Sequence, residues 1–171
     1  MSVILIGYRG SGKTTIGKKL ADRLWQKFVD TDEMVVAAAG QTIREIFEQK
    51  GEPHFRDLET AALRKACGLA DHVIALGGGA VLREENRQVL KDSQLKRIYL
   101  RCDAQILFQR IQSDPQTAAS RPHLTPLGGS IEEIRTLLAQ REPFYREVMS
   151  CELDVSSLTP AEALVHIARL L

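Results

Sequence analysis

Apolar residues recur along the chain in two different rhythms. Short runs rich in apolar residues are separated by longer stretches in which apolar positions repeat every three or four residues. The short runs predict strands and the longer stretches predict helices, an alternation typical of a parallel sheet with helices on both faces. The predicted strands are Val3–Ile6, Lys27–Val29, His72–Leu76, Arg97–Arg101 and Glu152–Val155.

Helices are marked by apolar stripes and by capping residues. A stripe predicts a helix over Lys13–Trp25, and two further helices are expected over Ile43–Gln49 and Glu52–Ala66. Capping patterns predict three helix starts, which are Thr42 with Glu45, Ser130 with Glu133, and Thr159 followed by Pro160.

One segment has neither rhythm. Gln112–Gly129 contains three prolines, two glycines and scattered polar residues without a period. Such a composition predicts a long mobile loop, and in an enzyme that transfers phosphate this loop would serve as a lid over about residues 112–126.

Composition limits the class of protein. The 171 residues fit one domain over 1–171, and the net charge of +1 gives no electrostatic case for nucleic acid or an anionic membrane as partner. The N-terminus has no signal-peptide pattern, and no run reaches the roughly 18 apolar residues of a membrane span. Cys67, Cys102 and Cys151 are widely spaced, which predicts buried, reduced thiols in the cytoplasm rather than a disulfide framework or a zinc site.

The strongest motif is Gly7-Tyr8-Arg9-Gly10-Ser11-Gly12-Lys13-Thr14, which lies between a predicted strand and a predicted helix. This is the context of a phosphate-binding P-loop of pattern G-x-x-x-x-G-K-S/T. Its glycines let backbone N–H groups converge on a phosphate, and the helix N-terminus adds positive potential. Lys13 would contact the β- and γ-phosphates, and the hydroxyl of Thr14 would contact Mg²⁺.

Two carboxylates follow the second predicted strand. Asp30 and Asp32 are one residue apart, so on an extended segment both would face the ligand crevice at the carboxyl edge of the sheet. One could hold Mg²⁺ through water while the other accepts a proton from an attacking hydroxyl. The alternative is that they only cap the next helix, with Asp32 as N-cap.

Gly77-Gly78-Gly79 ends the third predicted strand, where many P-loop ATPases place an acidic residue. Three glycines would instead bring a ligand close to backbone N–H groups, and this favours a small-molecule kinase over a mechanical ATPase. The alternative is that the glycines form a plain tight turn.

Four arginines are candidates for anion binding because of their placement in loops or near strand edges. The alternative is that they are ordinary surface residues. They are Arg56, Arg110, Arg121 and Arg141.

Taken in order, these pieces resemble the shikimate kinase family over about residues 3–170. The motifs that carry the resemblance are Gly7–Thr15, Asp30-Thr31-Asp32, Ile46-Phe47 through Gly51-Glu52 to Phe55-Arg56 and Glu59, Gly77-Gly78-Gly79-Ala80, Arg121-Pro122, and Arg141 with Tyr145-Arg146. The resemblance implies an α/β, three-layer P-loop kinase fold like that of nucleoside monophosphate kinases, with a five-stranded parallel sheet flanked by helices. It also implies ATP-dependent phosphorylation of the shikimate 3-hydroxyl in aromatic amino-acid biosynthesis, by a monomer.

The resemblance assigns a role to each candidate residue. The ATP phosphates would be held by Gly10, Ser11, Gly12, Lys13, Thr14 and Thr15, with Mg²⁺ on Thr14 and, through water, on Asp30. Shikimate would bind over about residues 32–60 and beyond, at Asp32, Arg56, Gly78, Gly79 and Arg141. Asp32, Lys13 and Arg121 would act in catalysis, and Glu59 would tether Arg56. Arg110 and the loop Ser156–Pro160 would bracket adenine.

Two other functions stay open at this point. A gluconate-type or nucleotide kinase would share the P-loop, but it would not need two arginines beside the three glycines. A nucleotide-sensing module would bind ATP without transferring phosphate, and the presence of Lys13, Asp32 and Arg121 argues against it. A panel of acceptors separates these readings from phosphorylation of shikimate.

Overall fold

A five-stranded parallel sheet organises the chain in the computed structural model, which describes residues 2–114 and 129–171. The strand order is β2-β3-β1-β4-β5, and every neighbouring pair is parallel. Each predicted strand is present, with bounds that differ by at most one residue at either end. The strands are β1 Val3–Ile6, β2 Lys27–Asp30, β3 His72–Ala75, β4 Lys96–Arg101 and β5 Cys151–Asp154.

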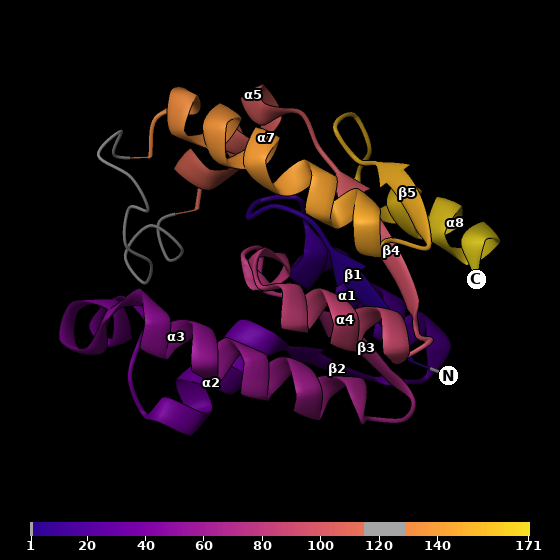
Figure 1. Ribbon diagram of the computed structural model, residues 1–171. Coiled ribbons are helices and arrows are strands. Elements are labelled where there is room, and N and C mark those ends of the chain that lie inside the picture. The colour runs from indigo at the N-terminus through magenta and orange to yellow at the C-terminus, as the bar shows by residue number, and fades with distance from the viewer. Residues whose placement is uncertain (1, 115–128) are drawn as a thin grey trace.

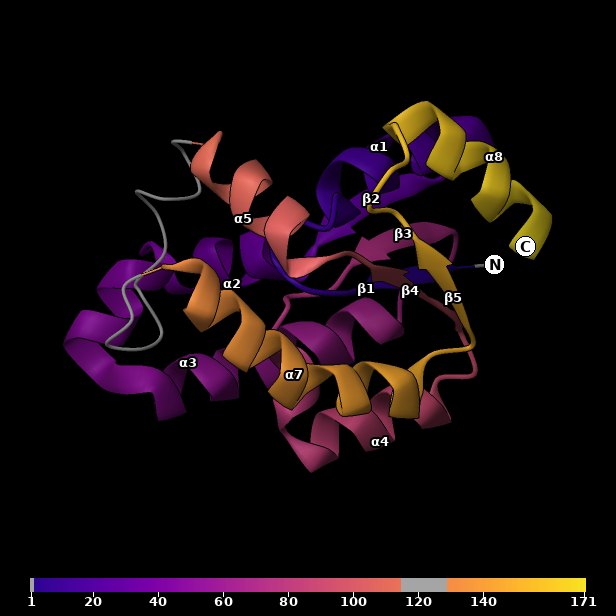
Figure 2. The ribbon, with the colours of Figure 1, turned by 90° about the horizontal axis from the view of Figure 1, so that it is seen from above.

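Helices cover both faces of this sheet. Helices α1 and α8 lie over one face, and α3, α4 and α7 lie over the other (Figures 1 and 2). The predicted three-layer α/β fold is therefore confirmed. The helices are α1 Lys13–Leu24, α2 Thr31–Ala39, α3 Ile43–Cys67, α4 Glu84–Asp92, α5 Ala104–Gln112, α7 Ile131–Val148 and α8 Pro160–Leu170, with a short 3₁₀ turn, η1, at Ala80–Leu82.

The central strand β1 shows why its apolar run is continuous. Val3 and Leu5 pack in the core beneath α1 and α8, whereas Ile4 and Ile6 pack in the core beneath α3, α4 and α7. All four side chains are fully buried. A parallel strand with helices on both faces has no solvent-facing side, so every position is apolar.

The capping patterns are confirmed in large part. Thr42 with Glu45 and Thr159 with Glu162 form complete capping boxes. Ser130 accepts a hydrogen bond from the N–H of Glu133, but the Glu133 carboxylate accepts from the N–H of Gly129 instead of closing the box. The two predicted helices at 43–66 form one element, α3, which is interrupted at Gly51 by a left-handed backbone (φ 81°).

Some expectations change or fall outside the described residues. Gln112 is the last residue of α5 rather than part of a loop, and residues 115–128, which hold most of the predicted lid and Arg121, lie outside the described residues. Of the three free cysteines, Cys102 is buried, whereas Cys67 and Cys151 are only half-buried. Across residues 2–114 and 129–171, every helix is too short or too polar to cross a membrane.

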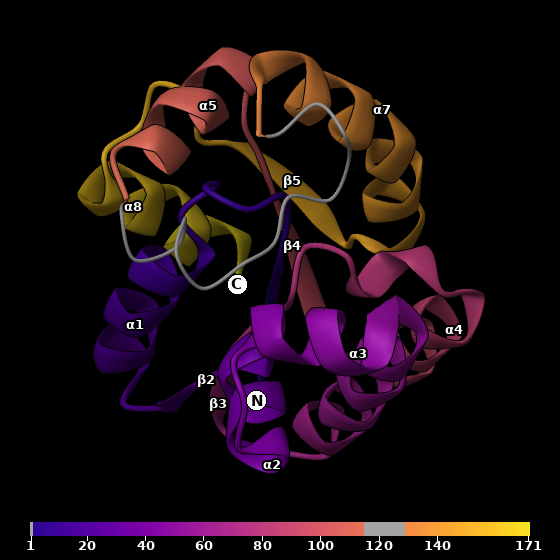
Figure 3. The ribbon, with the colours of Figure 1, turned by 90° about the vertical axis from the view of Figure 1, so that its left-hand side faces the viewer.

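The parallel strands bring their carboxyl ends to one edge of the sheet. The P-loop follows β1, Asp30 ends β2, and the three glycines follow β3. At this edge α5 and α7 lie on one side and α2 and α3 on the opposite side (Figure 3). Ligand sites of open parallel sheets lie at this edge, so the fold brings the separate motifs together.

Candidate functional site

The loop between β1 and α1 has the conformation that its glycines predict. Gly10 and Gly12 have φ values of +85° and +93°, in the left-handed region that favours glycine. Gly12 is the N-cap of α1 and makes no side-chain cap bond. The Nζ atom of Lys13 donates to the carbonyl oxygens of Gly7 and Tyr8 at 2.8 and 2.9 Å, which holds the ammonium group over the loop. The loop and the helix N-terminus thus present positive potential to a phosphate.

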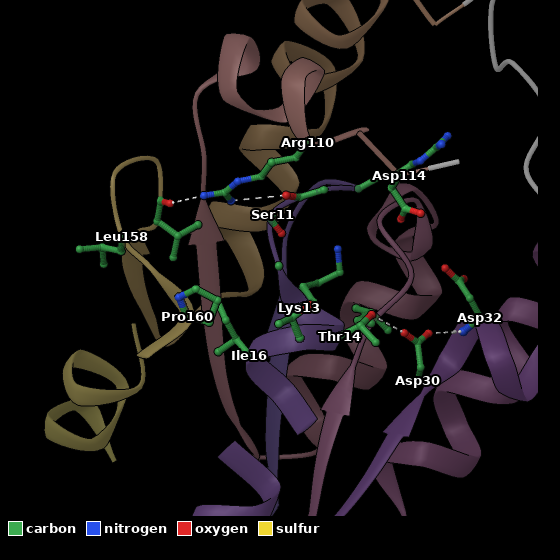
Figure 4. Close-up of a pocket in the computed structure, with 16 residues that line it drawn as sticks. Ser11, Lys13, Thr14, Ile16, Asp30, Asp32, Arg110, Asp114, Leu158 and Pro160 are labelled. Carbon is green, nitrogen blue, oxygen red and sulfur yellow. Dashed lines mark hydrogen bonds between the residues drawn. The ribbon is translucent and has the colours of Figure 1, made fainter. Parts of the chain in front are cut away.

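A cavity of about 390 Å³ opens in front of this loop (Figure 4). The structure places nearly all of the predicted phosphate and metal residues in its wall. Figure 4 shows Lys13 extending from α1 toward the centre of this space, with Asp30 and Asp32 on one side and Arg110 on another. The lining residues are Arg9, Gly10, Ser11, Gly12, Lys13, Thr14, Thr15, Ile16, Asp30, Asp32, Leu76, Arg110, Asp114, Val155, Leu158 and Pro160.

Asp30 and Thr14 form a pair of oxygen donors at the base of the cavity. The hydroxyl of Thr14 donates to Asp30 Oδ2 at 2.9 Å, and Asp30 Oδ1 accepts from the N–H of Asp32 at 2.9 Å. Burial, and after it the nearby Asp32 carboxylate, raise the pKa of Asp30, while these hydrogen bonds and the Lys13 charge oppose the rise. A hard cation bound here would favour the ionised form of Asp30.

The conformation expected around Asp32 is wrong, although its location is right. Asp30 itself is the N-cap of α2, so the helix begins at Thr31 and Asp32 lies in its first turn rather than on an extended segment. The expected alternative, in which Asp32 is the N-cap, is wrong for the same reason. Both carboxylates still line one cavity, because the first helical turn brings the buried Asp32 side chain back beside the strand edge.

Arg110 bridges two segments that are far apart in the sequence. Its guanidinium donates to the carbonyl oxygens of Val155 at 3.0 Å and of Gly10 at 3.5 Å. Leu158 and Pro160, from the loop after β5, line the same cavity. Together these groups form a half-apolar wall beside the P-loop, where the sequence predicts the adenine subsite.

Arg56 lies on α3 in a pair of ion pairs. Its NH1 atom donates to Glu59 Oε2 at 2.8 Å, as expected, and its NH2 atom donates to Glu52 Oε1 at 2.9 Å. Arg56 and Glu59 are buried, whereas Glu52 is exposed. Burial raises the pKa of Glu59 to about 7, while Arg56 and the charge of Arg141 oppose this rise and the charge of Asp32 adds to it. Glu59 therefore interacts electrostatically with both arginines and with Asp32.

The glycines after β3 are required by close approach. A Cβ atom on Gly77 would lie 2.5 Å from Asp32 Oδ1, and one on Gly79 would lie 2.4 Å from Arg56 NH1. Neither glycine has a positive φ, so backbone conformation alone does not require glycine. The sequence predicts that these glycines admit a ligand, and the structure adds a second reason for glycine, because a side chain at Gly77 or Gly79 would collide with Asp32 or Arg56.

Arg141 joins this cluster from α7. It is buried, and its guanidinium carbon lies 5.3 Å from the centre of the Tyr8 ring in the P-loop. Its Nε atom is buried and has no hydrogen-bond partner among the described residues. A buried donor of this kind is costly to leave unpaired, which marks a place for an anionic ligand.

Two neighbouring subsites result. None of Arg56, Gly78, Gly79 and Arg141 is among the described residues that line the 390 Å³ cavity. They adjoin it in two places. Asp32 lines the cavity and lies against Gly77, and Arg9, another lining residue, lies close to Gly78 and follows Tyr8, whose ring contacts Arg141. We call Asp32, Arg56, Glu59 and Arg141 the acceptor cluster. Chemically, the pair of subsites suits a phosphate donor beside an anionic acceptor.

The sequence analysis named three further contributors to the site within its motifs but gave them no role. Tyr145 donates from its hydroxyl to the carbonyl oxygen of Gly78 at 2.6 Å. Glu52 is the second partner of Arg56, and Arg9 lines the cavity. Helical spacing could have indicated the first two, because Tyr145 lies four residues after Arg141 and Glu52 lies four residues before Arg56.

Comparison with known proteins gives one family. The family model for shikimate kinases matches residues 9–171. The shikimate kinase of Rhodopirellula baltica is 38% identical over 165 residues, covering 96% of this chain and 87% of that protein. The structure of shikimate kinase from Acinetobacter baumannii in complex with shikimate superposes with a TM-score of 0.90 at 33% identity, covering 99% of this chain and 91% of that one.

The fold is also shared with kinases that act on other acceptors. A gluconokinase from Sinorhizobium meliloti has a TM-score of 0.64 at 22% identity, covering 99% of this chain and 92% of that one. At this identity the likeness concerns the fold alone. The acceptor is therefore decided by the residues of the site.

Proposed function

The chain belongs to the shikimate kinase family, and from this premise we propose how its residues transfer the γ-phosphoryl group of ATP to the 3-hydroxyl of shikimate. The products are shikimate 3-phosphate and ADP, in the pathway to the aromatic amino acids. The observation that carries this proposal is the position of two buried arginines, Arg56 and Arg141, beside a phosphate cavity. Two buried guanidiniums suit an acceptor that carries a carboxylate.

The phosphate end is built to stabilise charge. Backbone N–H groups of Gly10–Thr15 and the Lys13 ammonium hold the phosphates, and they face a transition state that is rich in negative charge. Lys13 exchanges its bonds to the Gly7 and Tyr8 carbonyl oxygens for bonds to phosphate oxygens. From the resemblance we propose that Arg121 adds a further positive charge at the transferring group and that Arg110 lies against adenine.

The oxygen donors beside the P-loop suit Mg²⁺. The Thr14 hydroxyl oxygen and Asp30 Oδ2 lie 2.9 Å apart in the wall of the cavity. Mg²⁺ commonly binds only one or two protein oxygens, together with phosphates and water. Thr14 would bind the ion directly and Asp30 through water. When bound, the ion neutralises charge on the β- and γ-phosphates.

The acceptor end fixes the hydroxyl that reacts. Arg56 and Arg141 bind the shikimate carboxylate, with Arg56 held by Glu59 and the unpaired Nε of Arg141 completing the contact. Gly78 and Gly79 lie along the ring. Asp32, at the border of both subsites, binds the ring hydroxyls and orients the 3-hydroxyl for in-line attack, accepting its proton as it reacts.

We further propose that residues 1–171 act as one domain, as a monomer in the cytoplasm, with a lid over about residues 112–126 and an acceptor region that begins at residues 32–60. The modest net charge of +1 supports small-molecule substrates rather than nucleic acid. Lid closure would exclude water, which competes with the shikimate hydroxyl for the γ-phosphoryl group.

A coupled assay of ADP release tests the function. MgATP is supplied with and without shikimate to the wild type, to Arg141→Ala, and to Arg135→Ala as a control in the exposed part of the same helix. We expect shikimate-dependent ADP release by the wild type and the control. For Arg141→Ala we expect a loss of about 2–4 kcal/mol of transition-state stabilisation, or roughly 30- to 1,000-fold in kcat/KM.

Other outcomes of this assay overturn the proposal in distinct ways. ADP release that depends on gluconate or on a nucleoside monophosphate, and not on shikimate, would show that this protein is a kinase for a different acceptor. ATP binding without a phosphorylated product from any acceptor would show that the protein is a nucleotide sensor and not a kinase.

A further inference from the structure

Tyr145 lies between Gly78 and Arg141 and does not line the phosphate cavity. It is 1% exposed, and its ring stacks on Tyr99 of β4 with centroids 5.0 Å apart and planes at 27°. Its hydroxyl donates to the carbonyl oxygen of Gly78 at 2.6 Å. Packing of the ring therefore holds the hydroxyl in place, where it makes a short, buried hydrogen bond to the loop of glycines.

The same hydroxyl also meets the acceptor arginine. Tyr145 follows Arg141 by one helical turn, so the two side chains share a face of α7. Burial raises the pKa of Tyr145, and the positive charge of the nearby Arg141 guanidinium opposes the rise. The phenol oxygen therefore lies beside Arg141 and at the same time donates to the carbonyl oxygen of Gly78, so that Tyr145 connects the guanidinium to the glycine loop.

A hydrogen bond to the Gly78 carbonyl affects the orientation of the peptide that follows it. It belongs to the peptide between Gly78 and Gly79, and a peptide that is flanked by two glycines rotates at little steric cost. In a trans peptide the C=O and the following N–H point in opposite directions. A hydrogen bond that holds the Gly78 oxygen toward Tyr145 therefore directs the Gly79 N–H to the opposite side.

The surroundings of these glycines include both subsites. A Cβ on Gly78 would lie 3.4 Å from both the backbone nitrogen of Arg9 and the carbonyl oxygen of Gly7 in the P-loop, and 3.7 Å from the Tyr145 hydroxyl. Gly79 lies against the Arg56 guanidinium. The orientation of this peptide thus bears on the P-loop and on both acceptor arginines.

We propose that Tyr145 is a positioning residue that fixes the Gly78–Gly79 peptide and aligns Arg141 with it, so that the acceptor meets a preset arrangement of donors. This inference rests on the proposed function, because it concerns binding of the same acceptor. Tyr145 does not touch the reacting atoms, and it acts through Gly78 and Arg141.

The test is Tyr145→Phe, which keeps the stacked ring and removes only the hydroxyl. Its matched control is Tyr99→Phe, the same change on the partner ring. We expect KM for shikimate to rise about tenfold in Tyr145→Phe, with KM for ATP within about twofold of wild type and Tyr99→Phe near wild type for both substrates. Thermal unfolding gives a second readout, in which saturating shikimate should raise Tm less in Tyr145→Phe than in wild type, while MgATP raises Tm equally.

The outcomes separate this inference from the proposed function. If wild type and Tyr145→Phe have the same KM for shikimate, or if both KM values rise together, Tyr145 supports packing only and the inference is wrong. If Tyr99→Phe shows the same selective rise, the ring pair and not the hydroxyl is responsible, which also overturns it. A wild type that does not phosphorylate shikimate overturns the proposed function itself.

Discussion

The P-loop and the acceptor cluster both present positive charge to an anion, but they are built in different ways. The P-loop uses a single contiguous segment, and its donors are backbone N–H groups with one flexible ammonium, that of Lys13. The acceptor cluster takes buried side chains from α2, α3 and α7, and its positive and negative charges balance one another. A change in the P-loop should therefore affect catalysis and little else. A change in the acceptor cluster should also affect its neighbours, binding selectivity and pH dependence.

Lys13→Ala should give the largest effect and should leave the fold intact. The ammonium group is partly exposed and donates to two loop carbonyl oxygens, and each such bond is worth about 0.5–1.5 kcal/mol, so the free energy of unfolding should fall by no more than about 3 kcal/mol. Loss of a charge aimed at the transferring phosphoryl group should lower kcat by about 10³-fold. Steady-state kinetics and urea unfolding measure the two quantities, with the exposed Lys19→Ala as control.

A large fall in stability for Lys13→Ala would contradict the separation between the two regions. It would mean that the P-loop depends on this side chain for its folding as well as for its chemistry.

Gly79→Ala should give an intermediate effect that is confined to the acceptor. The new methyl group would lie 2.4 Å from Arg56 NH1, at the far end of a long side chain, so the guanidinium should shift against its ion pairs with Glu52 and Glu59 while the fold persists. We expect KM for shikimate to rise about tenfold with KM for ATP unchanged, because a displaced guanidinium loses one charge-assisted bond. Gly68→Ala is the control, since its nearest atom would lie at 3.5 Å.

Equal increases in both KM values for Gly79→Ala would show that the two subsites are not separable. An unchanged KM for shikimate would remove Arg56 from the acceptor site.

Glu59→Gln should change the pH dependence of folding stability rather than the separation between the two KM values. Burial raises the pKa of Glu59 from 4.5 to about 7 in the folded protein. Between these values the unfolded chain has released this proton while the folded chain retains it. Folding stability from this group is therefore fully present below about pH 4.5 and is lost as the pH rises to about 7. The free energy of unfolding of the wild type, relative to Glu59→Gln, should fall over that range.

Urea unfolding of both proteins at pH 5, 6, 7 and 8 measures this difference. A difference that stays constant across the series would mean that Arg56 keeps Glu59 ionised throughout. The Glu59→Asp variant serves as a control that retains a carboxyl group at a shorter reach.

The contrast between the two regions also explains what the sequence could predict. The strands and the P-loop depend on local patterns, and they were predicted to within a residue because each is specified by neighbouring residues. Asp32 was expected to face the same cavity as Asp30, and it does, but the expected backbone was wrong, since the early start of α2 depends on Asp30 acting as the N-cap. That competition between strand extension and helix capping is not resolved by residue type alone.

The acceptor cluster could not be predicted from patterns among neighbouring residues in the sequence. Arg56 and Arg141 come from different helices, and nothing in the periodicity around either residue indicates that both face Glu59; only the family resemblance paired them. The bond from Tyr145 to Gly78 joins residues 67 positions apart. The close approach of Gly79 to Arg56 likewise follows from the packing of η1 against α3, so a glycine required by a distant side chain looks the same in sequence as a turn glycine.

The most direct test of the account compares shikimate with its methyl ester, which lacks the carboxylate charge, in wild type and in Arg141→Ala. Four values of kcat/KM give the coupling between the substrate carboxylate and the arginine. The account predicts that wild type prefers shikimate to the ester by about 100-fold and that Arg141→Ala reduces this preference at least tenfold, because the two changes remove the same interaction. If Arg141→Ala is slower on both substrates but keeps the full preference, Arg141 does not bind the carboxylate, and the acceptor cluster has been assigned wrongly.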